Sequence, residues 1–379
     1  MAGIYVHIPF CRKRCNYCDF FKSTDFLLKN RLLEGLNKEL KTRYSELNSE
    51  EIKTIYFGGG TPSVLLTSEL KDLLNTIVQN YQVSPDAEIT LEANPDDLTE
   101  EILSALKEIG FNRLSIGIQS FSESDLKLMN RRHTVLQAIQ SVKWAKKVGF
   151  TNISIDLIYG LPNQTLLEWE RNLHMAVELD VQHISAYNLS YHKGTVFYDQ
   201  LKMGILKELP DELSLQQFET LIRILHEAGF EHYEISNFCQ PGFYSKHNSA
   251  YWKNKKYLGI GPSAHSFDLK TRRWNVSSLS GYLHGLEYGE SYGEVEILTE
   301  QDCYNDYIIT GLRTKWGISE EFIQTEFSTP YLVHFQKIRN QYLSTRLVSG
   351  TYPKLWLSPE GLFISDKIME DFMLVSNHQ

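Results

Sequence analysis

The run His7-Ile-Pro-Phe-Cys-Arg-Lys-Arg-Cys-Asn-Tyr-Cys-Asp-Phe20 places three cysteines within eight residues. Three thiolates in this C-x3-C-x2-C spacing can bind three irons of a four-iron four-sulfur (4Fe–4S) cluster and leave the fourth iron without a protein ligand. An iron with an open coordination position can bind and activate a small molecule. We therefore interpret Cys11, Cys15 and Cys18 as metal ligands and expect this segment to lie at the centre of the functional site.

A structural zinc site is the alternative for these cysteines. Zinc in a closed site takes four ligands, often from two C-x2-C pairs. This chain has one such pair, and the fourth ligand would have to come from His7, Cys239 or Cys303. The spacing favours the iron–sulfur cluster and leaves zinc as the second reading.

The composition limits the class of protein. The chain of 379 residues carries 38 Lys and Arg against 47 Asp and Glu, a negative balance that argues against a nucleic-acid partner. Five cysteines, three of them too close together for a disulfide framework, indicate a reducing compartment. No stretch approaches the roughly 18 uninterrupted apolar residues of a transmembrane segment. We expect a cytoplasmic protein and leave open its peripheral attachment to the inner face of the membrane.

Short apolar runs alternate with amphipathic stretches over about the first 240 residues. The strand candidates are 3–7, 54–58, 88–93, 113–119, 152–158, 183–189 and 231–236. The helix candidates are 29–45, 67–81, 99–109, 133–148, 166–179 and 212–228. This alternation predicts an α/β fold with parallel strands and crossover helices, arranged as a partial (β/α)6-type barrel. In such folds the chemistry lies at the C-terminal ends of the strands.

Three regions follow from this pattern. Residues 1–237 hold the repeated units, and residues 238–298 open with an aromatic segment bounded by Pro and Gly that we expect to be a functional loop and to close the barrel. Residues 299–379 are predicted to form a small α-rich C-terminal domain. Its helical stretches and a terminal hairpin are expected at 299–314, 318–326, 330–345 and 355–364.

Several motifs follow one another along the first half of the chain. The cysteine run is preceded by Tyr5-Val-His-Ile-Pro-Phe10 and is followed by Gly58-Gly-Gly-Thr-Pro62, Leu91-Glu-Ala-Asn-Pro95, Gly117-Ile-Gln-Ser-Phe121, Asn130-Arg131 and Asp156-Leu-Ile-Tyr-Gly-Leu-Pro162. As an ordered set covering residue 3 to about 190, they resemble the radical S-adenosylmethionine (SAM) superfamily. The resemblance implies a radical SAM barrel with a 4Fe–4S cluster on the three cysteines and SAM on its open iron.

The resemblance also implies roles for individual residues. Those expected to bind SAM are Tyr5, Tyr17, Gly59, Gly60, Thr61, Glu92, Gln119, Arg131, Asp156 and Ser190. A zwitterionic amino acid and a ribose diol need both acceptors and a guanidinium donor, which this set supplies.

Within the superfamily, the chain is similar to the branch of oxygen-independent coproporphyrinogen III dehydrogenase. That enzyme has a fourth cysteine two residues after the third, where this chain has Phe20, and a long N-terminal extension, where this chain has ten residues before Cys11. Both departures, together with His247-Asn248-Ser249-Ala250-Tyr251-Trp252, resemble the radical SAM heme chaperones of the HemW type.

The resemblance to the heme chaperones implies that His247, Asn248, Tyr251 and Trp252 bind heme. Histidine is a common axial ligand of heme iron, and tyrosine and tryptophan offer flat apolar faces to a porphyrin. Direct ligation of the iron by His247 is left open, with Cys239 as a competing ligand or, more simply, a buried apolar residue.

We therefore expect a heme chaperone, with no catalytic residue assigned, that passes heme to apoproteins, in particular respiratory heme enzymes. An electron donor and a homodimer are expected partners, and whether SAM is cleaved is left open. The alternative is an enzyme that decarboxylates the propionates of coproporphyrinogen III in porphyrin metabolism. A radical enzyme acting on RNA or another metabolite fits the acidic chain less well.

Overall fold

A large curved sheet forms the body of the molecule. The computed structural model describes residues 2–47 and 49–375, and its main sheet has twelve strands in the order β12-β11-β10-β9-β1-β2-β3-β4-β5-β6-β8-β7. Neighbouring strands from β1 to β6 are parallel. These strands are β1 (Ala2–Ile8), β2 (Ile52–Gly59), β3 (Val83–Ala93), β4 (Arg113–Gln119), β5 (Ile153–Tyr159) and β6 (His183–Asn188). The predicted α/β fold with a run of parallel strands is confirmed, and the sheet is open.

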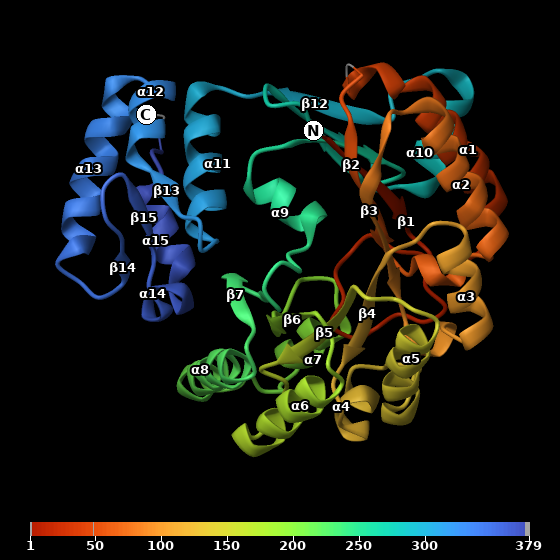
Figure 1. Cartoon of the computed structure of the whole chain (residues 1–379), viewed down its shortest axis with the longest axis horizontal. Coiled ribbons are helices and arrows are strands. Elements are labelled where there is room, and N and C mark those ends of the chain that lie inside the picture. Colours follow the sequence, from red (N-terminus) through yellow and green to blue (C-terminus); the bar gives the residue numbers. More distant parts are fainter. Residues whose placement is uncertain (1, 48, 376–379) are drawn as a thin grey trace.

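Helices connect the parallel strands and cover the outer side of the sheet (Figure 1). They are α1 (Lys29–Thr42), α2 (Thr67–Asn80), α3 (Glu100–Glu108), α4 (Glu123–Leu128), α5 (Val135–Lys147), α6 (Leu166–Glu178), α7 (Val196–Lys202) and α8 (Asp211–Glu227). Their apolar residues recur at helical spacing, as Leu32, Leu36 and Leu40 do in α1, and these side chains are buried. Helices α3 and α5 begin at threonines, Thr99 and Thr134, whose hydroxyls accept hydrogen bonds from backbone N–H groups.

Antiparallel strands extend both edges of the parallel run. On one edge β9 (Lys256–Ile260) lies parallel to β1, and β10 (His265–Phe267), β11 (Thr271–Asn275) and β12 (Gly293–Ile297) follow as antiparallel neighbours. On the other edge β8 (Asn237–Cys239) pairs antiparallel with β6, and β7 (Glu231–Glu234) pairs antiparallel with β8. The segment 231–236 is therefore not a seventh parallel strand, because the two residues between β7 and β8 allow only an antiparallel turn.

The predicted loop at 238–257 contains a helix. Helix α9 spans Lys246–Trp252, and the hydroxyl of Ser245 caps it by accepting from the N–H of Asn248 at 3.3 Å. His247 and Tyr251 stand four residues apart and so lie on the same face of this helix. Helix α9 lies between the sheet and α11 (Glu300–Leu312) (Figure 1).

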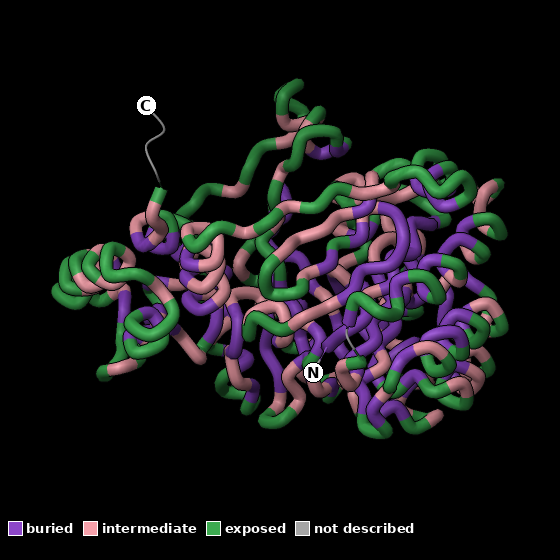
Figure 2. The backbone as a smooth tube through the Cα atoms, turned by 90° about the horizontal axis from the view of Figure 1, so that it is seen from above, coloured by how far each residue is buried: buried purple, intermediate pink, exposed green. Residues whose placement is uncertain are grey.

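The C-terminal residues form a smaller body with its own core. After α10 (Leu279–Tyr288) and α11, the elements are β13 (Ile318–Ser319), α12 (Glu320–Glu326), α13 (Thr329–Leu343), β14 (Val348–Ser349), β15 (Lys354–Leu357), α14 (Pro359–Phe363) and α15 (Ser365–Phe372). Tyr304, Phe335 and Phe372 are fully buried members of a second apolar cluster. Figure 2 colours the buried residues of the backbone purple, and some of them lie in the part of the molecule near the C-terminus. The predicted hairpin at 355–364 is wrong, since β15 leads into α14.

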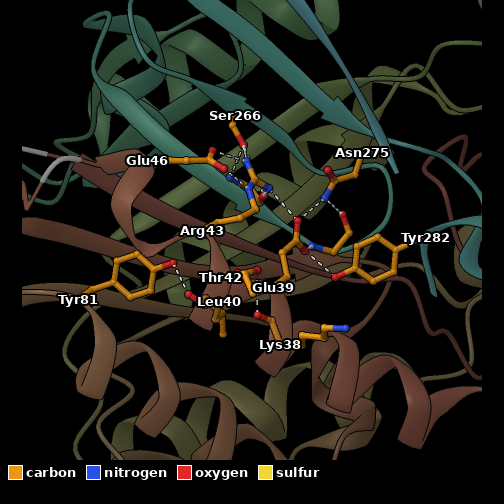
Figure 3. A network of polar contacts seen from close by, with 12 residues as sticks. Lys38, Glu39, Leu40, Thr42, Arg43, Glu46, Tyr81, Ser266, Asn275 and Tyr282 are labelled. Carbon is orange, nitrogen blue, oxygen red and sulfur yellow. Dashed lines mark hydrogen bonds and ion pairs between the residues drawn. The ribbon is translucent and has the colours of Figure 1, made fainter. Parts of the chain in front are cut away.

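A buried polar network ties α1 to the extended edge of the sheet (Figure 3). The carboxylate of Glu39 accepts from Arg43 Nη1 and Asn275 Nδ2, both at 2.8 Å, from the N–H of Gly261 at 2.8 Å and from the hydroxyl of Tyr282 at 2.6 Å. Glu39 is fully buried and Arg43 nearly so. The network fixes the turn after β9 and therefore the position of β10. Among residues 2–47 and 49–375, no helix is long and apolar enough to cross a membrane.

Candidate functional site: a cysteine-lined cavity beside an aromatic cavity

A cavity of about 440 Å³ lies at the C-terminal ends of the parallel strands. It brings together twelve of the residues predicted from the sequence: Cys11, Cys15, Tyr17, Cys18, Gly59, Gly60, Thr61, Glu92, Gln119, Arg131, Asp156 and Ser190. They come from the segment after β1, from strands β2 to β5 and from the loops that follow these strands and β6. This is the edge of the sheet at which parallel α/β folds place their ligands.

The cysteine segment after β1 is held in place by hydrogen bonds at its start and in its middle. Its start bonds to the strand-like Ser23, with the N–H of Cys11 donating to the Ser23 carbonyl at 3.0 Å. Its middle is anchored by Asn16, whose side chain donates to the Leu128 carbonyl at 2.8 Å, and by Asn130, whose side chain donates to the Arg14 carbonyl at 2.8 Å. The backbone that carries the thiols is therefore fixed by groups on α4 and the turn after it.

Hydrogen-bond donors lie beside two of the three thiols, where they can stabilise the negative charge of a cluster. The hydroxyl of Thr61 lies 3.4 Å from Cys11 Sγ, and Arg131 Nη1 lies 3.3 Å from Cys15 Sγ. Burial raises the pKa of Cys11 to about 11, so metal binding must displace a proton from this thiol. We find no trio of His, Cys, Asp or Glu side chains suited to a single metal ion in the part of the chain that the structure describes.

The glycines after β2 bring backbone against the cysteine segment. A Cβ on Gly60 would lie 2.7 Å from the carbonyl carbon of Pro9, and one on Gly59 would lie 2.5 Å from the His7 ring. Gly59 also takes a left-handed φ of 106°. Only glycine fits at these two positions, and their backbone forms a wall of the cavity. The fit explains why glycine stands at both Gly59 and Gly60.

Two carboxyl groups in the cavity have raised pKa values. Desolvation raises the pKa of Glu92 to about 7, against hydrogen bonds from Tyr56 at 2.7 Å and from the Gly59 N–H at 3.1 Å. Desolvation likewise raises the pKa of Asp156 to about 6, against the positive charge of Arg113. Groups with shifted pKa values in a cavity are typical of ligand-binding sites.

Arg131 has a partner that the sequence analysis left out of the site. Its Nη2 donates to Asn94 Oδ1 and to the Gly117 carbonyl, both at 2.6 Å, while its Nε is buried without a hydrogen bond to any described residue. Asn94 lines the same cavity and belongs to the motif Leu91-Glu-Ala-Asn-Pro95 that carried the resemblance. The place of Asn94 in that motif is the feature of the sequence from which its role in the site could have been predicted. The free Nε points to a ligand that brings an acceptor, as a carboxylate does.

Tyr5 lies outside this cavity and lines a second one of about 550 Å³, which we call the aromatic cavity. Its residues come from β1, the cysteine segment, α9, strands β9 to β11 and α11. They include Tyr5, His7, Phe20, Phe21, Tyr251, Trp252, Tyr257, His265, Phe267 and Arg272. Phe20 lines both cavities and its side chain is 67% exposed. The two cavities are therefore neighbours.

The four residues of the His247–Trp252 motif are placed differently. Tyr251 and Trp252 line the aromatic cavity. His247 is 2% exposed and lies behind them, with Nδ1 bonded to the Thr54 hydroxyl and Nε2 to the Tyr251 hydroxyl, both at 2.8 Å. Asn248 is half-buried at the start of α9 and does not line the cavity. Cys239 is buried in β8, outside both cavities.

The chain is similar to known proteins over nearly its whole length. Residues 5–176 match the radical SAM superfamily. The chain is 33% identical to the heme chaperone HemW of Lactococcus lactis, over 98% of this chain and 97% of that protein. It is 33% identical to HemW of Bacillus subtilis, over 98% and 99%. The solved structure of coproporphyrinogen III oxidase HemN from Escherichia coli superposes with a TM-score of 0.85 at 25% identity, over 98% of this chain and 90% of that one.

The open α/β sheet with a cysteine-lined cavity at its strand ends is that of a radical SAM protein. Such proteins bind a 4Fe–4S cluster and SAM, and the free thiols, the glycine wall and the unpaired Nε of Arg131 fit both groups. Within this class, the chain belongs to the HemW family.

The raised pKa values predict a pH dependence of SAM binding. If ionised Glu92 accepts from the ammonium group of SAM, affinity is lost as pH falls through its pKa of about 7. We expect the affinity of the reconstituted protein to be about tenfold lower at about pH 6 than near pH 7.5, measured by calorimetric titration. Glu92→Gln should bind weakly and lose most of this dependence. An affinity that is flat or falls with rising pH would contradict the role given to Glu92.

Proposed function

We propose that this protein binds heme in the aromatic cavity and passes it to apoproteins, with respiratory heme enzymes as the acceptors. The cluster and SAM occupy the neighbouring cysteine-lined cavity. A bound cluster would supply an electron for chemistry on SAM, and the residues that line this cavity, among them Glu92 and Arg131, would position SAM and exclude water. Membership of the HemW family, whose curated members are named heme chaperones, supports this proposal.

The aromatic cavity is the observation that carries the proposal. Flat rings from five separate parts of the chain line one space, among them Phe20, Tyr251, Trp252 and Tyr257. Its volume of about 550 Å³ lies inside the range of roughly 300–1,000 Å³ of small-molecule sites. The indole Nε1 of Trp252 is buried and donates to no described residue. A planar apolar ligand with acceptor groups at its edge satisfies both the rings and this donor.

His247 supports this cavity from behind. Its ring lies 5.0 Å from that of Tyr56 and 6.3 Å from that of Tyr5, and its Nε2 bond holds the hydroxyl of Tyr251. Burial lowers the pKa of His247 to about 3, so the imidazole is neutral and one nitrogen accepts while the other donates. We assign His247 the role of positioning Tyr251 against the ligand.

The second candidate is coproporphyrinogen III oxidation, which the structural likeness to HemN favours. In that reaction the porphyrinogen must reach the radical formed at SAM, inside the cysteine-lined cavity. In this chain the exposed ring of Phe20 stands between the two cavities. A ligand in the aromatic cavity lies beside the cysteine-lined cavity rather than inside it, which favours binding over oxidation.

The proposal is tested by two assays on one anaerobically reconstituted preparation. We expect about one heme per chain in a titration followed by visible absorbance, and no conversion of coproporphyrinogen III. Replacement of Tyr251 or His247 by alanine should weaken heme binding by about tenfold, or about 1.4 kcal/mol, since ring contacts are lost or misplaced. Tyr288→Ala, on the exposed side of α10, is the matched control and should bind as the unchanged chain does. Turnover to protoporphyrinogen at enzymatic rates would overturn the proposal.

Three further parts of the proposal come from the sequence and the family. We propose a cytoplasmic location with attachment to the inner face of the membrane, where respiratory acceptors reside. We also propose an electron donor that reduces the cluster and a homodimeric form. Co-sedimentation with membrane vesicles and size measurement in solution test the location and the dimer.

A further inference from the structure

Three histidines lie at or behind the aromatic cavity, and two of them have no free ring nitrogen. His7 Nδ1 is bonded to the Tyr5 hydroxyl and its Nε2 to the Phe21 carbonyl, both at 3.1 Å. His247 is bonded on both sides, to Thr54 and to Tyr251 at 2.8 Å. A heme iron needs a nitrogen lone pair that is not already engaged. To ligate iron, His7 or His247 would have to break a hydrogen bond and move out of its buried position.

His265 is the third histidine, and its ring is available. It opens β10, is exposed and lines the aromatic cavity. Neither of its ring nitrogens forms a hydrogen bond with any residue in 2–47 and 49–375. From these facts, and given the proposed function, we infer that His265 is the protein ligand of the iron of heme held in the aromatic cavity.

The fold orients this ring without using its nitrogens. His265 pairs with Trp274 across β10 and β11, and the two rings stack with centroids 6.2 Å apart and an angle of 29° between their planes. The next residue, Ser266, accepts from the Gly259 N–H at 2.9 Å and from Arg43 Nη2 at 3.1 Å. The buried network around Glu39 and Arg43 thus fixes the strand that carries the ligand. A histidine held by its ring face and its backbone keeps a nitrogen lone pair for the metal.

The charge state of His265 suits this role. Desolvation and, after it, the nearby charge of Arg272 lower the pKa of His265 below its usual value. The ring is therefore neutral near pH 7, the form that binds iron. The rings of Phe20, Phe21 and Trp252 line the same cavity and would pack against a porphyrin bound there.

The test is a titration of the reconstituted full chain with ferric heme, followed by visible absorbance and resonance Raman spectra. His265→Ala should lower heme affinity by at least about tenfold and remove the iron–histidine band, while the cluster absorbance stays unchanged. Added imidazole should restore the spectrum, because it refills the space left by the side chain. His174→Ala is the matched control, because His174 is an exposed histidine on α6 that lines neither cavity.

The outcomes separate this inference from the proposed function. If His265→Ala keeps the affinity and the spectrum of the unchanged chain, and His247→Ala alters the spectrum, the assignment of His265 is overturned although heme binding stands. If the unchanged chain binds no heme, the proposed function itself fails. Should His265→Ala not fold, His265→Gln, which keeps a polar side chain of similar reach without an imidazole, replaces it. Retention of the iron–histidine band in that variant would equally overturn the inference.

Discussion

Cys15→Ser is expected to abolish the cluster while leaving the protein folded. Cys15 lies half-buried in the segment after β1, where its Sγ faces Arg131 and the cavity, so a serine there is accommodated sterically. A hydroxyl does not replace the thiolate as a ligand, and two remaining cysteines do not hold a cubane cluster. We expect near-complete loss of iron, sulfide and visible absorbance after reconstitution, with the far-ultraviolet circular dichroism unchanged.

The matched control is Cys303→Ser. Cys303 is also half-buried, but it lies in α11 and lines neither cavity. It should retain the full iron and sulfide content. A Cys15→Ser protein that holds iron at full stoichiometry would contradict the ligand assignment and return zinc or another ligand set to consideration.

Glu39→Ala is expected to cost about 3–5 kcal/mol of the free energy of unfolding. The substitution leaves the buried guanidinium of Arg43 and the donors of Asn275, Gly261 and Tyr282 without their acceptor (Figure 3). These groups join α1 to α10 and to the edge strands of the sheet. Urea denaturation of the unreconstituted chain, followed by circular dichroism, measures the loss.

Glu287→Ala is the control for this effect. Glu287 joins the same two helices through an ion pair with Arg31 at 2.9 Å, but both side chains are more than half exposed. A surface pair of this kind contributes about 0–1 kcal/mol. Equal destabilisation by the two substitutions would show that the buried network has no special part in holding the edge of the sheet.

The repeated core was predictable from the sequence because its pattern is local. Strands β1 to β6 and the long helices between them stand where the apolar runs and helical spacings predicted, within a few residues at their ends. The extended edge was not predicted, since β9 to β12 are short strands of three to five residues and their pairing depends on distant residues such as Glu39. Helix α9 was missed because one buried face of seven residues gives a weak period. Ser358 and Pro359 begin helix α14, whereas we interpreted them as part of a hairpin.

The cysteine-lined cavity was predictable to a greater degree than the aromatic one. Its residues stand at the ends of consecutive strands, so the order of the motifs already places them on one rim. Tyr5 lines the aromatic cavity and not the cysteine-lined one, although it belongs to β1, the strand that leads to Cys11. His265 gave no signal in the sequence, because its availability depends on the strand pairing that stacks it on Trp274. A lone histidine in a sequence does not show whether its ring nitrogens are engaged.

We propose that heme binds in the aromatic cavity, whereas the cluster and SAM bind in the neighbouring cysteine-lined cavity. A heme titration of the reconstituted chain, carried out with and without saturating SAM, tests this most directly. We expect about one heme per chain and an affinity that SAM changes by less than about threefold, with the small effect transmitted through Phe20, which lines both cavities. Displacement of heme by SAM, or of SAM by heme, would contradict it.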